Sequence, residues 1–277
     1  MKHLSIEFFP PKSDEAEQSL LGEVDKLCAH LKPDFFSVTF GAGGSMQSRT
    51  LDMVTQIQTR SNIPTAAHIT CIGTSKKDIV LLLNHYKNNN ISRLIVLRGD
   101  LPSGANFYHH GDFKYASDLV KYIAETHPGF FDLSIAAYPE YHPQSNSPDD
   151  DLKHFINKAN LGVNRAITQY FYNYDAYESF IEKASPHVNI PIVPGIMPIT
   201  NYKGLMRFSD MCGAEIPRWI RLKLEHYQSD PESLKAFGTE VVANLCDKLI
   251  QNNAPGLHFY CLNKAQPVLD ILKVIKD

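Results

Sequence analysis

Three features are missing from this sequence of 277 residues: a long apolar run, a paired-cysteine motif and an excess of basic charge. No stretch approaches the roughly 18 to 20 apolar residues that span a bilayer, and a strand pattern begins almost at once, so we expect neither a membrane helix nor a leader segment. The five cysteines are odd in number and far apart, with no C-x-x-C spacing, which is typical of a reducing compartment. We therefore expect a cytoplasmic protein whose thiols are mostly small buried groups.

Charge and histidine content exclude two further classes. The net charge is −3 and the lysines and arginines are scattered, so the sequence lacks the basic footprint of a nucleic-acid-binding protein. Twelve histidines raise the question of a metal, most of all His109, His110 and His142. No H-x-x-x-H or H-x-E-x-x-H spacing is present, and adjacent histidines rarely face one ion. We predict no metal site.

The sequence does contain a regular alternation of short apolar runs with amphipathic stretches. The runs typical of strands lie at 4–9, 35–40, 65–71, 93–98, 132–138, 165–171, 191–197 and 257–262. Helical patterns between them cover 15–31, 50–60, 75–88, 115–126, 150–159 and 174–183. The run at 94–97 is continuously apolar, as in a parallel sheet covered on both faces. Eight strand-then-helix units predict an α/β fold of the (β/α)8 TIM barrel type.

One interval is longer than the others. About sixty residues separate the seventh and eighth strands, and they include the charged amphipathic stretch 230–251. This pattern predicts extra helices between strands 7 and 8. Since no low-complexity linker, repeat or shift in composition marks a boundary, we predict a single domain over 1–277.

In such a barrel, the active site lies where the strands run out into the following helices. Polar residues occupy those exits at Glu7, 39–44, 68–70, 98–100, 138–142, 168–169 and 258–263. Glu7 is the most informative of them, because aromatic residues flank it and two prolines then end the strand. In an apolar pocket its pKa would rise toward roughly 6 to 7, the range that suits a general acid. A solvated residue at a strand end is the ordinary alternative.

Other exit residues are open to more than one interpretation. The glycine cluster 41–44 lacks the G-x-G-x-x-G spacing of a dinucleotide fingerprint, because position 46 is methionine. Asp100 is either an ion-pair partner of Arg98 or a second charged catalytic group. Glu7 and Asp100 together leave a glycoside hydrolase open. Phe208 is either core or an aromatic platform for a flat ligand.

Six ordered motifs resemble methylenetetrahydrofolate reductases of the bacterial type. They lie at 6–11, 97–102, 115–120, 136–143, 166–169 and 194–198, and the likeness runs from Glu7 to Asn263. The resemblance implies a barrel that binds FAD and reduces 5,10-methylenetetrahydrofolate to 5-methyltetrahydrofolate with NADH or NADPH. It also implies a ping-pong mechanism and a product that feeds methionine synthesis. The alternative is a folate- or pterin-binding barrel without redox chemistry.

The resemblance also implies roles for individual residues. Glu7 matches the general acid that protonates the folate N10, and Asp100 matches an aspartate that favours the cationic iminium ion. The implied cofactor-binding residues are Thr39, His68, Arg98, Gly99, Asp100, Tyr115, Ala116, Ser117, Tyr138, His142, Asp151 and Lys158. The implied substrate-binding residues are Glu7, Asp100, Gln169, Phe208 and Lys264. The implied partners are folate and nicotinamide substrates and a homo-oligomer, with no nucleic acid and no membrane.

The sequence departs from the family pattern at three positions. Lys264 stands where arginine is common, so a bidentate grip on the folate glutamate tail becomes a single ammonium contact. Gly204 replaces a glutamine of some relatives, and Phe40 replaces a tyrosine. The sequence ends just after the eighth unit, so we expect no regulatory domain of the eukaryotic kind.

Overall fold

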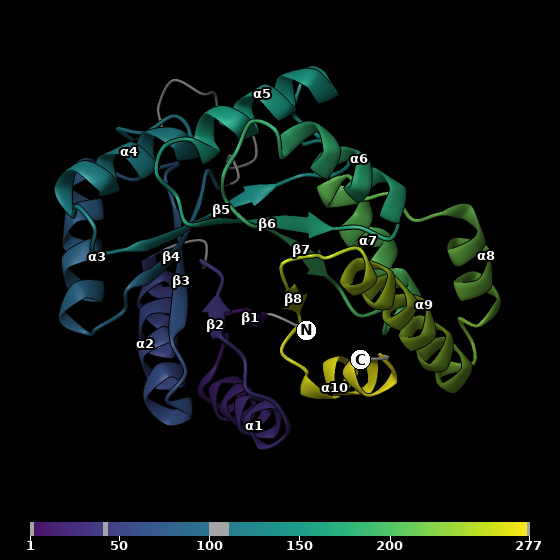
Figure 1. Cartoon of the computed structure of the whole chain (residues 1–277). Coiled ribbons are helices and arrows are strands. Elements are labelled where there is room, and N and C mark those ends of the chain that lie inside the picture. The colour runs from purple at the N-terminus through teal and green to yellow at the C-terminus, as the bar shows by residue number, and fades with distance from the viewer. Residues whose placement is uncertain (1–2, 41–43, 100–110, 276–277) are drawn as a thin grey trace.

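Eight parallel strands close into a barrel in the order of the chain (Figure 1). The computed structural model describes residues 3–40, 44–99 and 111–275, and for 44–48 it describes the backbone alone. The strands are β1 (Leu4–Phe8), β2 (Phe35–Val38), β3 (Thr65–Thr70), β4 (Arg93–Leu97), β5 (Asp132–Ala137), β6 (Arg165–Tyr170), β7 (Ile192–Ile196) and β8 (Leu257–Tyr260). Closure between β8 and β1 confirms the predicted (β/α)8 TIM barrel.

Helices surround the barrel and alternate with its strands (Figure 1). Those that follow the first six strands are α1 (Asp14–His30), α2 (Gly44–Ser61), α3 (Lys76–Asn88), α4 (Ala116–Thr126), α5 (Pro148–Ala159) and α6 (Tyr174–Ala184). Between β7 and β8 lie α7 (Tyr202–Cys212), α8 (Arg218–His226) and α9 (Pro231–Gln251), which confirms the predicted extra helices. Helix α10 (Ala265–Val274) follows β8 and packs against α1 and α9. No helix in the described ranges has the length and apolar character needed to cross a bilayer.

Local sequence signals explain where several helices begin. Ser147 caps α5 by accepting a hydrogen bond from the Asp150 N–H at 3.2 Å, and Pro148 stands at the first helical position. Ser75 caps α3 in the same way, through the Asp78 N–H at 3.1 Å. Capping satisfies N–H groups that have no partner inside the helix. These two starts agree with the capping residues in the sequence.

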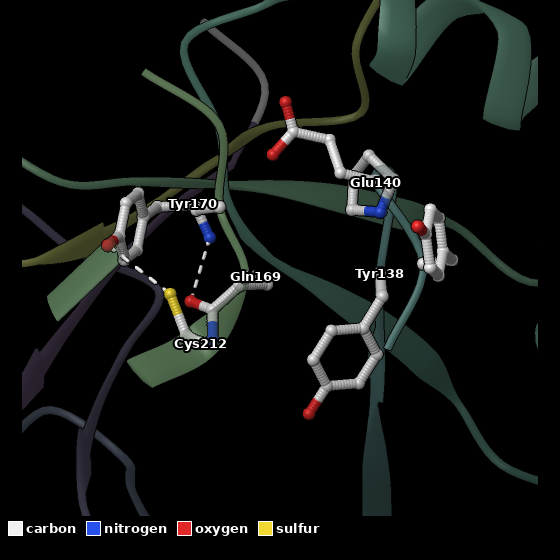
Figure 2. A pocket seen from close by; sticks show the side chains of 9 residues that line it. Tyr138, Glu140, Gln169, Tyr170 and Cys212 are labelled. Atoms are coloured by element: carbon white, nitrogen blue, oxygen red, sulfur yellow. Dashed lines mark hydrogen bonds between the residues drawn. The ribbon is translucent and has the colours of Figure 1, made fainter. Parts of the chain in front are cut away.

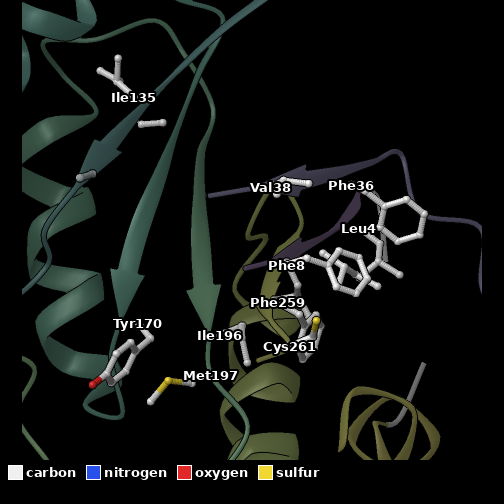
Figure 3. Close-up of a cluster of buried hydrophobic side chains, with 14 of the residues drawn as sticks. Leu4, Phe8, Phe36, Val38, Ile135, Tyr170, Ile196, Met197, Phe259 and Cys261 are labelled. Carbon is white, nitrogen blue, oxygen red and sulfur yellow. The ribbon is translucent and has the colours of Figure 1, made fainter. Parts of the chain in front are cut away.

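The strands present alternate residues to two different environments. Leu4, Phe8, Phe36 and Phe259 belong to the large apolar cluster, in which the outer face of the barrel packs on the helices (Figure 3). The residues between them, such as Phe35, point the other way and form a small separate cluster inside the barrel, with Ala66, Ile95 and Ile167. Because side chains alternate along a strand, the polar residues that share the inner register face the barrel interior. They include Ser5, Glu7, Ser37, His68, Ser134 and His258.

The ladder between β6 and β7 is irregular between Ile167 and Tyr170. The Gly195 N–H donates to the Thr168 hydroxyl at 2.9 Å, and the Tyr260 hydroxyl donates to the Thr168 carbonyl at 2.7 Å. A Cβ on Gly195 would lie 2.1 Å from that carbonyl oxygen, so only glycine fits here. Such irregularities re-aim side chains near active sites, and this one includes Gln169.

Candidate active site

Glu7 lies inside the barrel near its carboxyl-terminal mouth and is only 8% exposed. Its Oε2 atom lies 2.9 Å from Nε2 of His68 and 3.3 Å from Nε2 of His258, and it accepts a hydrogen bond from the Ser37 hydroxyl at 3.3 Å. His68 is on β3, which does not pair with β1, so this contact crosses the barrel interior. The sequence prediction of a carboxylate at the mouth agrees with this position, and the solvated alternative is wrong.

The two histidines contact the carboxylate differently. His258 makes the hydrogen bond to Glu7, and its other ring nitrogen, Nδ1, lies 2.8 Å from the Ser5 hydroxyl. The ring also packs on Phe35 and meets the edge of Tyr260, so its orientation is fixed on every side. Nε2 of His68 is not aligned for a hydrogen bond with any described group, so its short contact with Glu7 is that of an ion pair when the ring is protonated.

The histidines decide the ionisation of Glu7. Burial is the largest influence and by itself would raise the pKa of the carboxyl group. The contacts of the carboxylate with His68 and His258, first among them the charge of His68, together outweigh burial and lower the pKa of Glu7 to about 2. The raised pKa that an apolar pocket would give Glu7 is therefore not found, because imidazoles surround the carboxylate. Phe8 faces the helices, where its ring meets Phe36, and Phe9 is 41% exposed, so neither forms an apolar pocket around the carboxylate.

The residues expected at a cofactor follow four neighbouring strands. Thr39 follows β2, His68 lies on β3, and Arg98 and Gly99 follow β4. Further along the chain, Tyr115, Ala116 and Ser117 lie at the start of α4, Tyr138 and His142 follow β5, and Asp151 and Lys158 lie on α5. The expectation for Asp100 falls in 100–110, outside the described residues, as do His109 and His110. The described members therefore share one side of the mouth, over β2 to β5.

A chain of hydrogen bonds connects part of this side. Arg98 donates through its guanidinium group to the side-chain oxygen of Gln144. The Gln144 N–H donates to Nδ1 of His142 at 3.0 Å, and the His142 N–H donates to Asp151 at 3.2 Å. The ring of His142 also meets that of Tyr138 edge-on, with centroids 4.7 Å apart. Sequence reasoning missed Gln144, whose only signal was its place in the loop after β5.

The donor set on this side suits a flavin dinucleotide. The first N–H groups of α4, at Ala116 and Ser117, have no acceptor within their own helix and suit a phosphate. A hollow of about 130 Å³ lies apart from α4, between the segment after β5 and helices α5 and α6, and Tyr138, Asp151 and Phe180 are among the residues that line it. Burial raises the pKa of Asp151 from its ordinary value. Gly99 has φ 83°, a conformation that glycine adopts without strain.

Lys158 occupies a different environment from the one its expected role suggests. Its ammonium group donates to the Ala136 carbonyl on β5 at 2.9 Å. Burial lowers the pKa of Lys158 to about 8, and nearby Asp151 partly offsets this effect. The side chain thus ties α5 to β5, and the expected phosphate contact stays a prediction.

The residues expected at the substrate lie over the other strands. Gln169 is on β6, and its side-chain oxygen accepts the Tyr170 N–H at 3.0 Å. Phe208 on α7 is half-buried and packs against the core, and the Arg207 guanidinium lies over its ring at 5.6 Å. At least part of the ring therefore belongs to the core, as one of the two alternatives from the sequence had it. Lys264 precedes α10 and is exposed. Together with Glu7 on β1, these residues lie over β6 to β8 and β1.

A small pocket beside Gln169 contains a carboxylate that sequence reasoning did not single out (Figure 2). Glu140 follows β5, and its Oε2 accepts the Glu215 N–H at 2.8 Å, while Oε1 is buried with no partner among the described residues. Burial raises the pKa of Glu140 to about 7. On the far wall, the Tyr170 hydroxyl contacts Ser209 at 3.0 Å and the Cys212 thiol at 3.3 Å.

A carboxylate with two imidazoles is a set of side chains that also binds metals. Here both Nε2 atoms approach a single oxygen of Glu7 at hydrogen-bond or ion-pair distances. Within the described ranges, no group of three or more His, Cys, Asp or Glu side chains is arranged to hold a metal ion. The geometry is that of a proton-holding cluster.

Comparisons with known proteins show the family to which the chain belongs. A family model described as methylenetetrahydrofolate reductase matches residues 1–276. The 5,10-methylenetetrahydrofolate reductases of Salmonella typhimurium and Escherichia coli K12 are each 37% identical over 265 residues, which is 95% of this chain and 87% of theirs. The enzyme of the same name from Buchnera aphidicola subsp. Schizaphis graminum is 38% identical over 271 residues, covering 96% of this chain and 89% of its own.

A solved structure with a similar fold is that of an uncharacterized protein from Clostridium thermocellum that binds two copies of 5-methyl-5,6,7,8-tetrahydrofolic acid. The two chains match with a TM-score of 0.64 and 16% sequence identity, over 98% of this chain and 93% of that chain. At this identity the likeness shows the fold and nothing more.

Proposed function

Because the chain belongs to the methylenetetrahydrofolate reductase family, we propose that it reduces 5,10-methylenetetrahydrofolate to 5-methyltetrahydrofolate with bound FAD and with NADH or NADPH. Residues 1–277 would act as one FAD-binding barrel domain. One site would serve both substrates in turn, so the expected kinetics are ping-pong. The methyl product would feed methionine synthesis.

The observation that carries this proposal is the buried carboxylate of Glu7 between two imidazoles. Opening the five-membered ring of the substrate requires a proton at N10. A carboxyl group with a pKa of about 2 is an anion at neutral pH, so a proton must reach Oε2 of Glu7 before it can pass to N10. We propose the contact between Oε2 of Glu7 and Nε2 of His258 as the route, because Ser5 holds the opposite nitrogen of that ring.

Bound FAD, once reduced by NADH or NADPH, would supply the hydride that reduces the iminium ion. Around it, the first N–H groups of α4 would hold the phosphates, Arg98 and Tyr138 would orient the rings, and Asp151 would bind a hydroxyl group. Asp100 would stabilise the cationic iminium ion by its negative charge. We expect Asp100→Asn to weaken folate turnover while FAD is retained.

The remaining residues would bind the folate. Gln169 carries an amide that can donate or accept, which suits a site used by two different substrates. Phe208 would pack on a flat ring, and Lys264 would meet the glutamate tail. We also propose a cytoplasmic homo-oligomer without nucleic-acid or membrane partners, and sedimentation velocity would measure its size.

The deciding experiment separates the two half-reactions. Purified protein should be yellow, should lose its flavin absorbance under anaerobic NADH or NADPH, and should regain it on adding 5,10-methylenetetrahydrofolate. The second candidate, a folate- or pterin-binding barrel without redox chemistry, predicts colourless protein that FAD does not reconstitute. That result would reject the flavin-dependent reaction.

A further inference from the structure

The side chain of Asn263 forms hydrogen bonds with both backbone groups of Phe9, the residue that follows β1. Its side-chain oxygen accepts the Phe9 N–H at 2.8 Å, and its side-chain NH2 group donates to the Phe9 carbonyl at 3.0 Å. Only an amide side chain offers an acceptor and a donor in this arrangement. The clamp joins the segments that follow β8 and β1, 254 residues apart in the sequence.

The segment after β8 also holds Glu7 itself. The backbone N–H and the thiol of Cys261 both donate to the Glu7 carbonyl, at 3.3 Å and 3.0 Å. The Glu7 side chain contacts His258 on the same stretch of chain. The distance between the carboxylate and this imidazole therefore depends on the register between the two segments.

Nothing beyond Phe9 can replace the clamp. Pro10 and Pro11 follow directly, and proline has no N–H to donate. On the other side, Leu262 and Asn263 have φ of 52° and 58°, in the left-handed region. Asparagine tolerates this region and leucine does not, so the turn persists because surrounding contacts hold it. The two hydrogen bonds to Phe9 are such contacts.

We propose that Asn263 is a positioning residue for Glu7, fixing the β1 exit so that the carboxylate stays aligned with His258. The inference rests on the proposed function for its effect on turnover, but the alignment exists without any ligand. It assigns Asn263 a role in the proton-transfer geometry rather than direct contact with the substrate.

The test uses substitutions that keep the left-handed backbone. Asn263→Gly removes the clamp and retains a residue suited to positive φ, and Asn263→Asp keeps the acceptor for the Phe9 N–H but loses the donor. Asn253→Gly is the matched control, because Asn253 also has positive φ, at 61°, in an exposed turn before β8. The Asn253→Gly variant shows what replacing asparagine by glycine at a positive-φ position does when no clamp is lost.

The first readout needs no cofactor or substrate. The His258 imidazole resonances of ligand-free protein are compared by NMR among the variants at one fixed pH, because their chemical shifts report the contact with the Glu7 carboxylate. We expect the resonances in Asn263→Gly to move toward their positions in Glu7→Gln, those in Asn263→Asp to lie between, and those in Asn253→Gly to match the wild type. His258 resonances unchanged by Asn263→Gly would overturn the positioning role.

The second readout is the separation of the half-reactions. Reoxidation of the reduced enzyme by the folate should slow by about 10- to 100-fold in Asn263→Gly, whereas reduction by the nicotinamide should be unchanged. Equal slowing of both steps would indicate a general structural defect and would also reject the inference. A wild-type protein that reduces no folate would defeat the proposed function, and the NMR comparison of His258 would still decide whether Asn263 positions Glu7.

Discussion

Oε2 of Glu7 and Nε2 of His68 lie 2.9 Å apart, although β2 separates the strands that carry them. The contact exists because both side chains take the inner register of a closed barrel. With His258 on the third side, the carboxylate is a buried anion held by two imidazoles. In the reaction that we propose, the proton donor is thus a cluster of three side chains rather than a neutral carboxyl group, and two of the predictions below test this proposal.

Removing the carboxylate should affect one half-reaction only. We expect Glu7→Gln to slow folate-dependent reoxidation by about 100-fold or more, the usual contribution of general acid catalysis, because the amide cannot deliver the proton. Reduction by the nicotinamide should survive, since it needs no proton at N10. Anaerobic stopped-flow absorbance measures both steps, and a variant that loses them equally would assign Glu7 a structural role.

The same carboxylate should make stability depend on pH in acid. The pKa of Glu7 is lowered from an ordinary value of 4.5 to about 2 in the fold. The ionised side chain therefore stabilises the folded protein fully above about pH 4.5, and this stabilisation is lost as the pH falls toward 2. The difference corresponds to at most about 3 kcal/mol. Urea unfolding of wild type and Glu7→Gln should show a gap in stability that narrows from pH 5 to pH 3. A constant gap would contradict the lowered pKa.

Glu140 should have the opposite effect at neutral pH. Burial raises the pKa of this carboxyl group from 4.5 to about 7, so the fold favours the neutral acid and loses stability as the pH rises through that range. Glu140→Gln keeps an oxygen that can accept the Glu215 N–H. After allowance for partial exposure, we expect the variant to be more stable than wild type by about 1 kcal/mol at pH 8 and equal to it near pH 4.5. Thermal unfolding across this range measures the difference.

Gly195 should tolerate no side chain. A Cβ there would lie 2.1 Å from the Thr168 carbonyl oxygen and 2.6 Å from the Tyr260 ring, so Gly195→Ala should lower the free energy of unfolding by about 2 to 3 kcal/mol. Gly22→Ala in α1 is the control, since nothing lies within 4 Å of its Cβ position, and it should stabilise by about 0.5 to 1 kcal/mol. Similar values for the two variants would show that the β6–β7 contact relaxes freely.

Lys264 should affect folate affinity and leave the flavin unaffected. We expect Lys264→Ala to raise KM for the folate several-fold with kcat preserved, because the exposed ammonium group is the proposed partner of the glutamate tail. Lys264→Arg should lower KM, since a guanidinium group can bind a carboxylate through two hydrogen bonds. Steady-state kinetics at low and high salt measure both variants, and an unchanged KM in Lys264→Ala would place the tail elsewhere.

The sequence alone determined the architecture, because strand and helix periodicity are local properties. The predicted strands ended one or two residues too far along the chain, as at 35–40 against Phe35–Val38, because the apolar pattern continues after the chain has left the ladder. The extra helices before β8 were also readable from their amphipathic pattern. Glu7 was identifiable because two prolines end its strand.

Only the tertiary structure decided what surrounds Glu7. His68 is 61 residues away in the sequence and His258 is 251 residues away, and barrel closure with the inner register brings them to one oxygen. The flanking aromatic residues suggested an apolar pocket and a raised pKa, but strand alternation turns Phe8 away from the carboxylate. The direction of a pKa shift depends on neighbours in space, and for Glu7 those neighbours come from other strands.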